Sequence, residues 1–160
     1  MLTTNYSIVI FFAALIFASI TDIKSHKIKI WVFPIATVLS VPALILTIMN
    51  TRSSNLLYDI SPYIMGFFAG FSLFLFIALK GKGGGGDAIM MGSIGLIFGM
   101  TRLVEIFIIA IAIMSLFVIG YIIYSVIKRS KMNFYFPLAP FILGGFVIDI
   151  IYNFISFGGI

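Results

Sequence analysis

The chain has 160 residues, of which 62% are hydrophobic, and its mean hydropathy is +1.23. Globular proteins contain about 45–50% apolar residues, so this composition excludes a soluble domain. The net charge of +5 comes from Lys and Arg that lie between apolar runs. That pattern predicts contact with anionic lipid and no nucleic-acid partner. The absence of cysteine excludes disulfides and thiol catalysis, and a single histidine makes a metal site unexpected, so we predict no metal or cofactor.

The apolar residues fall into six runs separated by short polar breaks. No Lys or Arg precedes the first run, so we expect a retained transmembrane helix there instead of a cleaved signal peptide. Five runs have the length of about 20 residues that a bilayer crossing requires, whereas the fourth is shorter and would extend only about 20 Å as a helix. The runs are 5–23, 30–49, 58–79, 88–100, 103–127 and 136–157.

Loop charge predicts that the short fourth run also crosses the membrane. With six crossings, only Arg52 and Arg102 lie on one side, and eight basic residues lie on the other. If the run 88–100 were a re-entrant loop, the division would be six against four. Because cytoplasmic loops carry the excess of Lys and Arg, we predict an all-α, single-domain membrane protein over residues 1–160, with six transmembrane helices and both termini extracytoplasmic. The eight residues are Lys24, Lys27, Lys29, Lys80, Lys82, Lys128, Arg129 and Lys131.

Two of the five acidic residues stand at ends of apolar runs that this topology places in the cytoplasmic half. Asp22 closes the first run, and Asp87 opens the fourth after a glycine run. A charged side chain at the centre of a bilayer costs roughly 2.5–3.5 kcal/mol on insertion scales, so acids kept there indicate function. Two nearby carboxylates tend to share one proton and can serve as general base and general acid. The glycines before Asp87 lack Cβ atoms, which would let a peptide backbone approach.

Three blocks of sequence resemble the type IV prepilin peptidases and the related archaeal preflagellin peptidases. Gly84-Gly85-Gly86-Asp87 matches the Gly-x-Gly-Asp signature of intramembrane aspartyl proteases. Residues 18–24 look like the first aspartate block, and residues 136–145 look like the Pro-x-x-Pro-Phe-x-x-Gly opening of the last helix. The order and spacing of these blocks agree with the family over nearly the whole chain.

This resemblance implies a membrane aspartyl endopeptidase with Asp22 and Asp87 as its catalytic pair. The implied reaction removes the basic leader from prepilin-like or preflagellin-like precursors at the cytoplasmic face of the cell membrane. The chain lacks a cysteine-bearing domain, so it resembles the minimal form, without methyltransferase activity. It departs from the family where Ile89 stands in place of the usual lysine. By the same resemblance, substrate-binding or site-shaping roles are expected for Lys24, Gly84, Gly86, Pro137 and Pro140.

Other interpretations remain open at this point. The chain could be a small transporter, an assembly factor of a pilus or secretion machinery, or an inactive homologue. Asp22 could be an interfacial acid beside Lys24, and the glycine run could be a linker. A third acid, Asp149, could serve a proton relay, although we expect it to contact Asn153 one turn later.

Two packing contacts are also expected from spacing alone. Arg102 and Glu105 stand three residues apart, which predicts an ion pair on one helix face. Gly66 and Gly70 form a pair of small residues at a spacing of four, which predicts close packing on a neighbouring helix.

Overall fold

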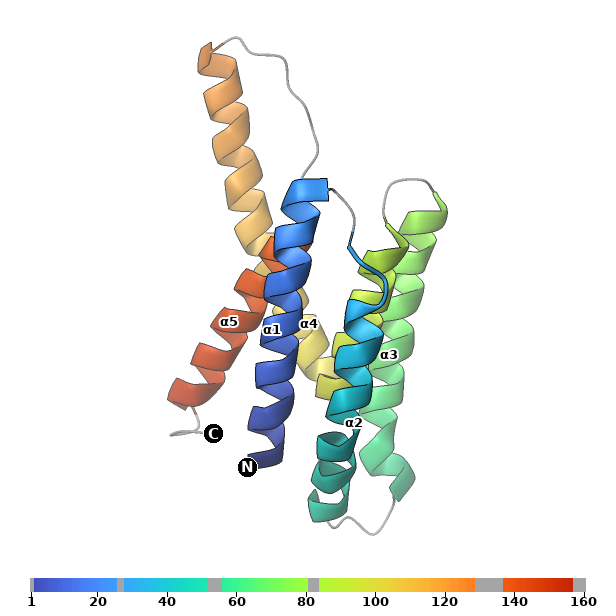
Figure 1. Cartoon of the computed structure of the whole chain (residues 1–160). Helices are drawn as coiled ribbons and strands as arrows, with labels where there is room; N and C mark the ends of the chain where they lie inside the picture. The colour runs from blue at the N-terminus through green and yellow to red at the C-terminus, as the bar shows by residue number, and fades with distance from the viewer. Residues whose placement is uncertain (1, 26–27, 52–55, 81–83, 129–136, 157–160) are drawn as a thin grey trace.

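The computed structural model describes residues 2–25, 28–51, 56–80, 84–128 and 137–156. These residues form helices and no strand, which confirms the all-α class. Every helix is long and apolar enough to cross a membrane, in agreement with a multi-pass membrane protein (Figure 1). The helices in the described ranges are α1 (Leu2–Ser25), α2 (Val32–Thr51), α3 (Leu56–Leu79), α4 (Gly85–Lys128) and α5 (Ala139–Ser156).

Helix α4 contains both the fourth and the fifth apolar runs and bends sharply between them. The bend is at Gly99, whose φ of 82° and ψ of 170° are dihedrals that only glycine adopts readily. The arms before and after Gly99 run in opposite directions (Figure 1). We expected the break at the polar residues after Met100, but Thr101 and Arg102 are helical. Polar side chains do not interrupt backbone hydrogen bonding, whereas a residue with positive φ does.

Helix α3 packs against the first arm of α4 at very close range. A Cβ atom added to Gly66 would lie 2.5 Å from the carbonyl oxygen of Gly95, and one added to Gly70 would lie 2.6 Å from that of Met91. Such distances leave room only for hydrogen, so both glycines are needed for the two backbones to approach. This confirms the packing expected from the Gly66/Gly70 spacing.

The same contacts show how deep Asp87 lies. Gly66 opposes Gly95 and Gly70 opposes Met91, so the antiparallel register places Asp87 level with Phe74. Helix α3 continues for five more residues to Leu79, which is about 7–8 Å at 1.5 Å per residue. Asp87 therefore lies inside the bundle, about one to two helical turns from the level at which α3 ends. This position explains why the fourth apolar run is short.

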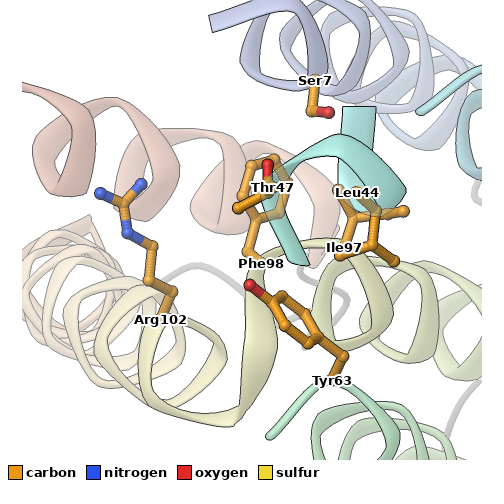
Figure 2. A pocket seen from close by; sticks show the side chains of 7 residues that line it. All are labelled: Ser7, Leu44, Thr47, Tyr63, Ile97, Phe98 and Arg102. Atoms are coloured by element: carbon orange, nitrogen blue, oxygen red, sulfur yellow. The ribbon is translucent and has the colours of Figure 1, made fainter. Parts of the chain in front are cut away.

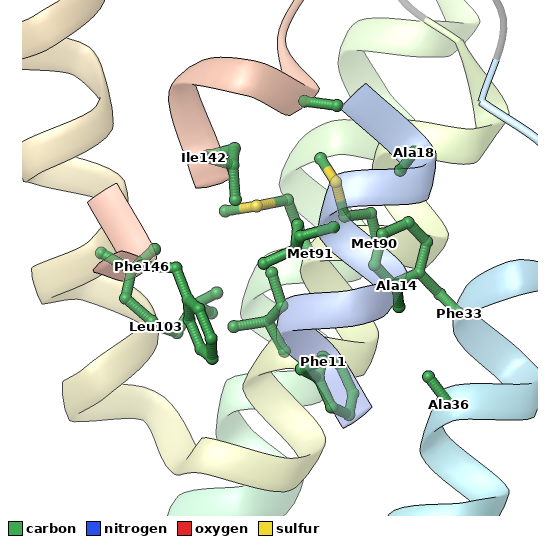
Figure 3. Packing of buried hydrophobic residues seen from close by; sticks show 14 of the residues in the cluster. Phe11, Ala14, Ala18, Phe33, Ala36, Met90, Met91, Leu103, Ile142 and Phe146 are labelled. Atoms are coloured by element: carbon green, nitrogen blue, oxygen red, sulfur yellow. The ribbon is translucent and has the colours of Figure 1, made fainter. Parts of the chain in front are cut away.

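The first arm of α4 is also the most enclosed segment among the residues that the structure describes. Its Met90 and Ile94 are fully buried, and Phe98 makes edge contacts with Phe11 of α1 and Phe146 of α5 at ring-centroid distances of 5.2 and 5.3 Å. Figure 3 shows this core, in which methionines from α4 extend between α1, α2 and α5. Packing on several sides holds the arm in place, and with it the aspartate at its start.

A prediction follows for the contact between α3 and α4. Gly95→Ala should lower the free energy of unfolding by about 1–3 kcal/mol, because the new methyl group would collide with the backbone of Gly66. The matched control is Gly120→Ala, since no atom lies within 4 Å of a Cβ added at Gly120. That variant should keep or raise stability. Thermal unfolding in detergent measures both, and equal melting temperatures would contradict the packing described here.

Candidate active site

Asp22 lies in the last turn of α1 and is almost completely buried, with 4% of its surface exposed. Its Oδ2 accepts a hydrogen bond of 3.1 Å from the backbone N–H of Ala139. Ala139 is the first residue of α5, and amides in the first turn of a helix have no acceptor within that helix. The carboxylate thus satisfies an amide at the positive end of the helix dipole. This burial argues against an interfacial acid beside Lys24.

The two prolines expected to shape the site determine where α5 begins. Pro137 directly precedes the turn, and the carbonyl of Leu138 accepts hydrogen bonds of 3.1 Å from the N–H groups of Phe141 and Ile142. Pro140 stands in the first helical turn, where its missing N–H has no intrahelical role. We expected this helix from residue 136, but it begins at Ala139. The start at Ala139 is what presents its amide to Asp22.

Asp87 is the third residue of α4 and is half-buried. Its Oδ2 accepts a hydrogen bond of 3.1 Å from the Gly84 N–H, and its own N–H donates to the Gly84 carbonyl oxygen, also at 3.1 Å. The carboxylate reaches back to the N-cap amide as the acid of a capping box does, with glycine at the cap. Gly84 is thus the hydrogen-bond donor to Asp87, and its role in shaping a site stays a prediction.

The fold brings the two aspartates to the same end of the bundle. There α1 ends with Asp22 in its last turn, and α4 begins with Asp87 in its first turn, next to the start of α5 (Figure 1). Each carboxylate accepts a backbone N–H from the start of a helix. A carboxyl group can accept a proton when ionised and donate one when protonated, so two of them at one end of the bundle can serve as a base and an acid. The arrangement can therefore support general acid–base chemistry.

The glycines before Asp87 have different surroundings. Gly86 is buried, and a Cβ added there would lie 2.9 Å from the Cβ of Ile28 and 3.0 Å from its carbonyl oxygen. Ile28, in the segment between α1 and α2, was not predicted to be near the site. Gly85 is exposed, and among the described residues beyond its own helix turn no atom lies within 4 Å of an added Cβ. Open space for a peptide backbone therefore exists at Gly85, whereas at Gly86 the protein itself fills it.

Two other residues singled out from the sequence lie near the aspartates. Lys24 is exposed in the last turn of α1, and in the described ranges no ion pair joins it to Asp22 or Asp87. Ile89 is half-buried and packs against the hydrophobic core. Position 89, at which the family that the sequence resembles usually has lysine, is thus a packing position in this chain. His26 lies outside the described residues.

A cavity of about 190 Å³ lies near the other end of the bundle (Figure 2). Its residue on α1, Ser7, precedes Asp22 by 15 positions, which is about 22 Å along the helix. The cavity is therefore separate from the pair of aspartates. It is lined by Ser7, Leu44, Thr47, Tyr63, Ile97, Phe98 and Arg102.

The third acid, Asp149, takes part in contacts between helices. Asn153 donates to its backbone oxygen at 2.8 Å and to its Oδ1 at 3.2 Å, which confirms the expected contact. The expected pairing of Arg102 with Glu105 is wrong: within the described ranges Arg102 pairs with Asp149, at 3.8 Å. The guanidinium reaches across to α5 because α5 packs on this arm of α4. Asp149 lies about 15 Å along α5 from Ala139, away from the candidate site.

Comparison with known protein families decides which family the chain represents. A sequence model of the type IV leader peptidase family matches residues 9–119, more than half of the chain. The chain belongs to the type IV leader peptidase family. The matched region of this leader peptidase homologue includes both Asp22 and Asp87, and the family is one of aspartic-type proteases. The block at 136–145 lies beyond the match. Searches of curated proteins and of solved structures found no match.

The two neighbouring glycines allow a prediction about the site. Gly86→Ala should lower stability by about 1–3 kcal/mol, because the added methyl group must displace Ile28. Gly85→Ala meets open space and should leave stability unchanged or slightly higher. Chemical or thermal unfolding of the two purified variants measures the difference. A Gly86→Ala protein as stable as the Gly85→Ala protein would contradict the contact with Ile28.

Proposed function

We propose that this protein is an intramembrane aspartyl endopeptidase that removes the basic leader from type IV prepilin-like or preflagellin-like precursors. Membership of the type IV leader peptidase family supports a leader peptidase activity in general. The observation that carries the proposal for this chain is the position of Asp22 and Asp87 at the same end of the bundle, each hydrogen-bonded to the amide of a helix start. The substrate is a membrane-inserted protein whose leader reaches this end of the bundle.

The proposed reaction uses the two carboxylates in different protonation states. The ionised aspartate takes a proton from water as the water oxygen attacks the scissile carbonyl carbon. The protonated aspartate donates its proton to the carbonyl oxygen, and a tetrahedral intermediate forms. Proton transfer to the leaving nitrogen then accompanies cleavage of the C–N bond. The two roles belong to the pair and are not assigned to one residue.

The proposal includes a topology of six crossings, with both termini extracytoplasmic and the site at the cytoplasmic face of the cell membrane. The division of the basic residues supports this orientation. The reversal of α4 at Gly99 supports it as well, because it returns Lys128 to the end of the bundle at which Gly85 begins. A precursor anchored in the same membrane would meet the aspartates from the side on which its basic leader lies.

The first test of the proposal replaces each aspartate separately. Asp22→Asn and Asp87→Asn should each reduce cleavage of a precursor by at least about 100-fold, because an amide can neither accept the proton of water nor donate one to the carbonyl oxygen. Cleavage of a full-length precursor in membranes, followed by gel mobility, measures the loss.

The matched control is Asp59→Asn, which makes the same chemical change in the first turn of α3, at the opposite end of the bundle. It should leave cleavage unchanged. The protein level and melting temperature of each variant show whether it is inserted and folded. Full cleavage by either Asp22→Asn or Asp87→Asn would refute the catalytic pair. Loss of cleavage in Asp59→Asn would show that the effect of an Asp→Asn change is not specific to Asp22 and Asp87.

The topology can be tested with single cysteines, since the natural chain has none. Leu57→Cys and Leu79→Cys place exposed thiols at opposite ends of α3, and Ile127→Cys and Ile155→Cys place them near the ends of α4 and α5. A membrane-impermeant maleimide added to intact cells should label positions 57 and 155. Positions 79 and 127 should be labelled only after permeabilisation. Labelling of position 127 in intact cells would exclude the six-crossing arrangement.

A further inference from the structure

An open groove of about 540 Å³ lies where α1 ends and α2 begins. Apolar side chains dominate the lining that the structure describes, in which Ser25 and Lys29 are the polar residues. The tryptophan in the lining, Trp31, is 77% exposed. Tryptophan favours the interface between lipid and water, as expected for a position next to a helix start. The groove is lined by Ser25, Ile28, Lys29, Ile30, Trp31, Val32 and Ile35.

The groove is adjacent to the pair of aspartates. Ile28 forms part of its wall and also packs on Gly86, which directly precedes Asp87. Ser25, which also lines the groove, is three residues after Asp22. The open space at Gly85 is next to Gly86, the glycine that Ile28 contacts. A peptide that crosses Gly85 to reach Asp87 would therefore pass beside the groove.

The charge of the groove indicates which part of a precursor it can hold. Among the described residues that line it, the one charged residue is Lys29, whose Nζ lies 5.5 Å from the centre of the Phe17 ring. A cation at the border repels a basic leader, and the apolar wall offers a leader no acceptor for its charges. Apolar side chains, in contrast, can pack against this wall without leaving a charge or a hydrogen-bonding group unsatisfied. Because the precursor is inserted in the membrane, such a contact gains from close packing and not from the removal of water.

We propose that this groove is the specificity subsite that binds apolar side chains of the precursor next to the scissile bond, on the side opposite the basic leader. The inference rests on the proposed leader peptidase function. It assigns Ile35 and Trp31 to substrate selection and gives them no part in proton transfer. The groove then determines the position of the precursor, so that the bond between its basic and its apolar segments lies at Gly85 and Asp87.

A pair of variants on α2 tests this subsite. Ile35→Phe narrows the groove, whereas Val38→Phe adds the same ring about one turn later, at an exposed residue outside the lining. Ile35→Phe should raise KM for a full-length precursor about tenfold with little change in kcat, and Val38→Phe should change neither. Replacing the precursor's apolar residue next to the cut by alanine should bring the KM of the Ile35→Phe protein back toward the wild-type value. Equal KM values for the two variants would overturn the proposal.

Trp31 gives a second readout that does not need cleavage. It is the only tryptophan of the chain, and the Phe substitutions keep it so. In the Asp87→Asn protein, a tryptophan-free peptide with the precursor's apolar segment should shift Trp31 emission in a saturable way. Ile35→Phe should weaken that binding about tenfold, whereas Val38→Phe should not, and a peptide with only the basic leader should cause no shift.

The two readouts separate the possible failures. If the peptide binds with the expected dependence on Ile35 but the wild-type protein cleaves no precursor, the subsite stands and the proposed function fails. If cleavage occurs and Trp31 emission responds to vesicles of anionic phospholipid but not to the peptide, the groove binds lipid and the subsite is overturned. Cleavage without any response to the apolar peptide also overturns it.

Discussion

The hydrogen bond from the Ala139 N–H to Asp22 joins the end of the first helix to the start of the last one. A carboxylate deep in a membrane protein requires donors, because water there is scarce and an unsatisfied charge is costly. The first turn of a helix has spare N–H groups and a positive dipole end, so it meets this need without a basic side chain. Asp87 uses the same solution through Gly84. The positions of both acids thus depend on where α4 and α5 begin.

Those helix starts are themselves fixed by close packing around the first arm of α4. Gly66 and Gly70 allow α3 to approach this arm, and Gly145 allows α5 to approach the second arm, where an added Cβ would lie 2.5 Å from the carbonyl oxygen of Ile106. Between apolar helices in lipid, association depends on such close contacts and on few polar ones. The ion pair of Arg102 with Asp149 adds one polar contact between α4 and α5. Small residues therefore set the geometry that the aspartates need.

Much of this arrangement could be predicted from the sequence. Apolar runs marked the helices to within a few residues, and the cost of acids in an apolar chain singled out Asp22 and Asp87. The bend was placed too late, because a polar pair after Met100 is more conspicuous in sequence than a glycine with positive φ. The contact of Ile28 with Gly86 and the partner of Arg102 could not be predicted. Both join segments far apart in the chain, and local spacing carries no information about such contacts.

The distance in sequence between Asp22 and its donor has a consequence for biosynthesis. The two residues are 117 positions apart, so Asp22 enters the membrane well before the residue that will satisfy it has been synthesised. Until α5 docks, water or lipid headgroups must solvate the carboxylate at the open end of the bundle. An incomplete chain therefore holds the acid in a different environment from that of the mature protein. A site that forms only after the last helix has packed would keep partly inserted chains inactive.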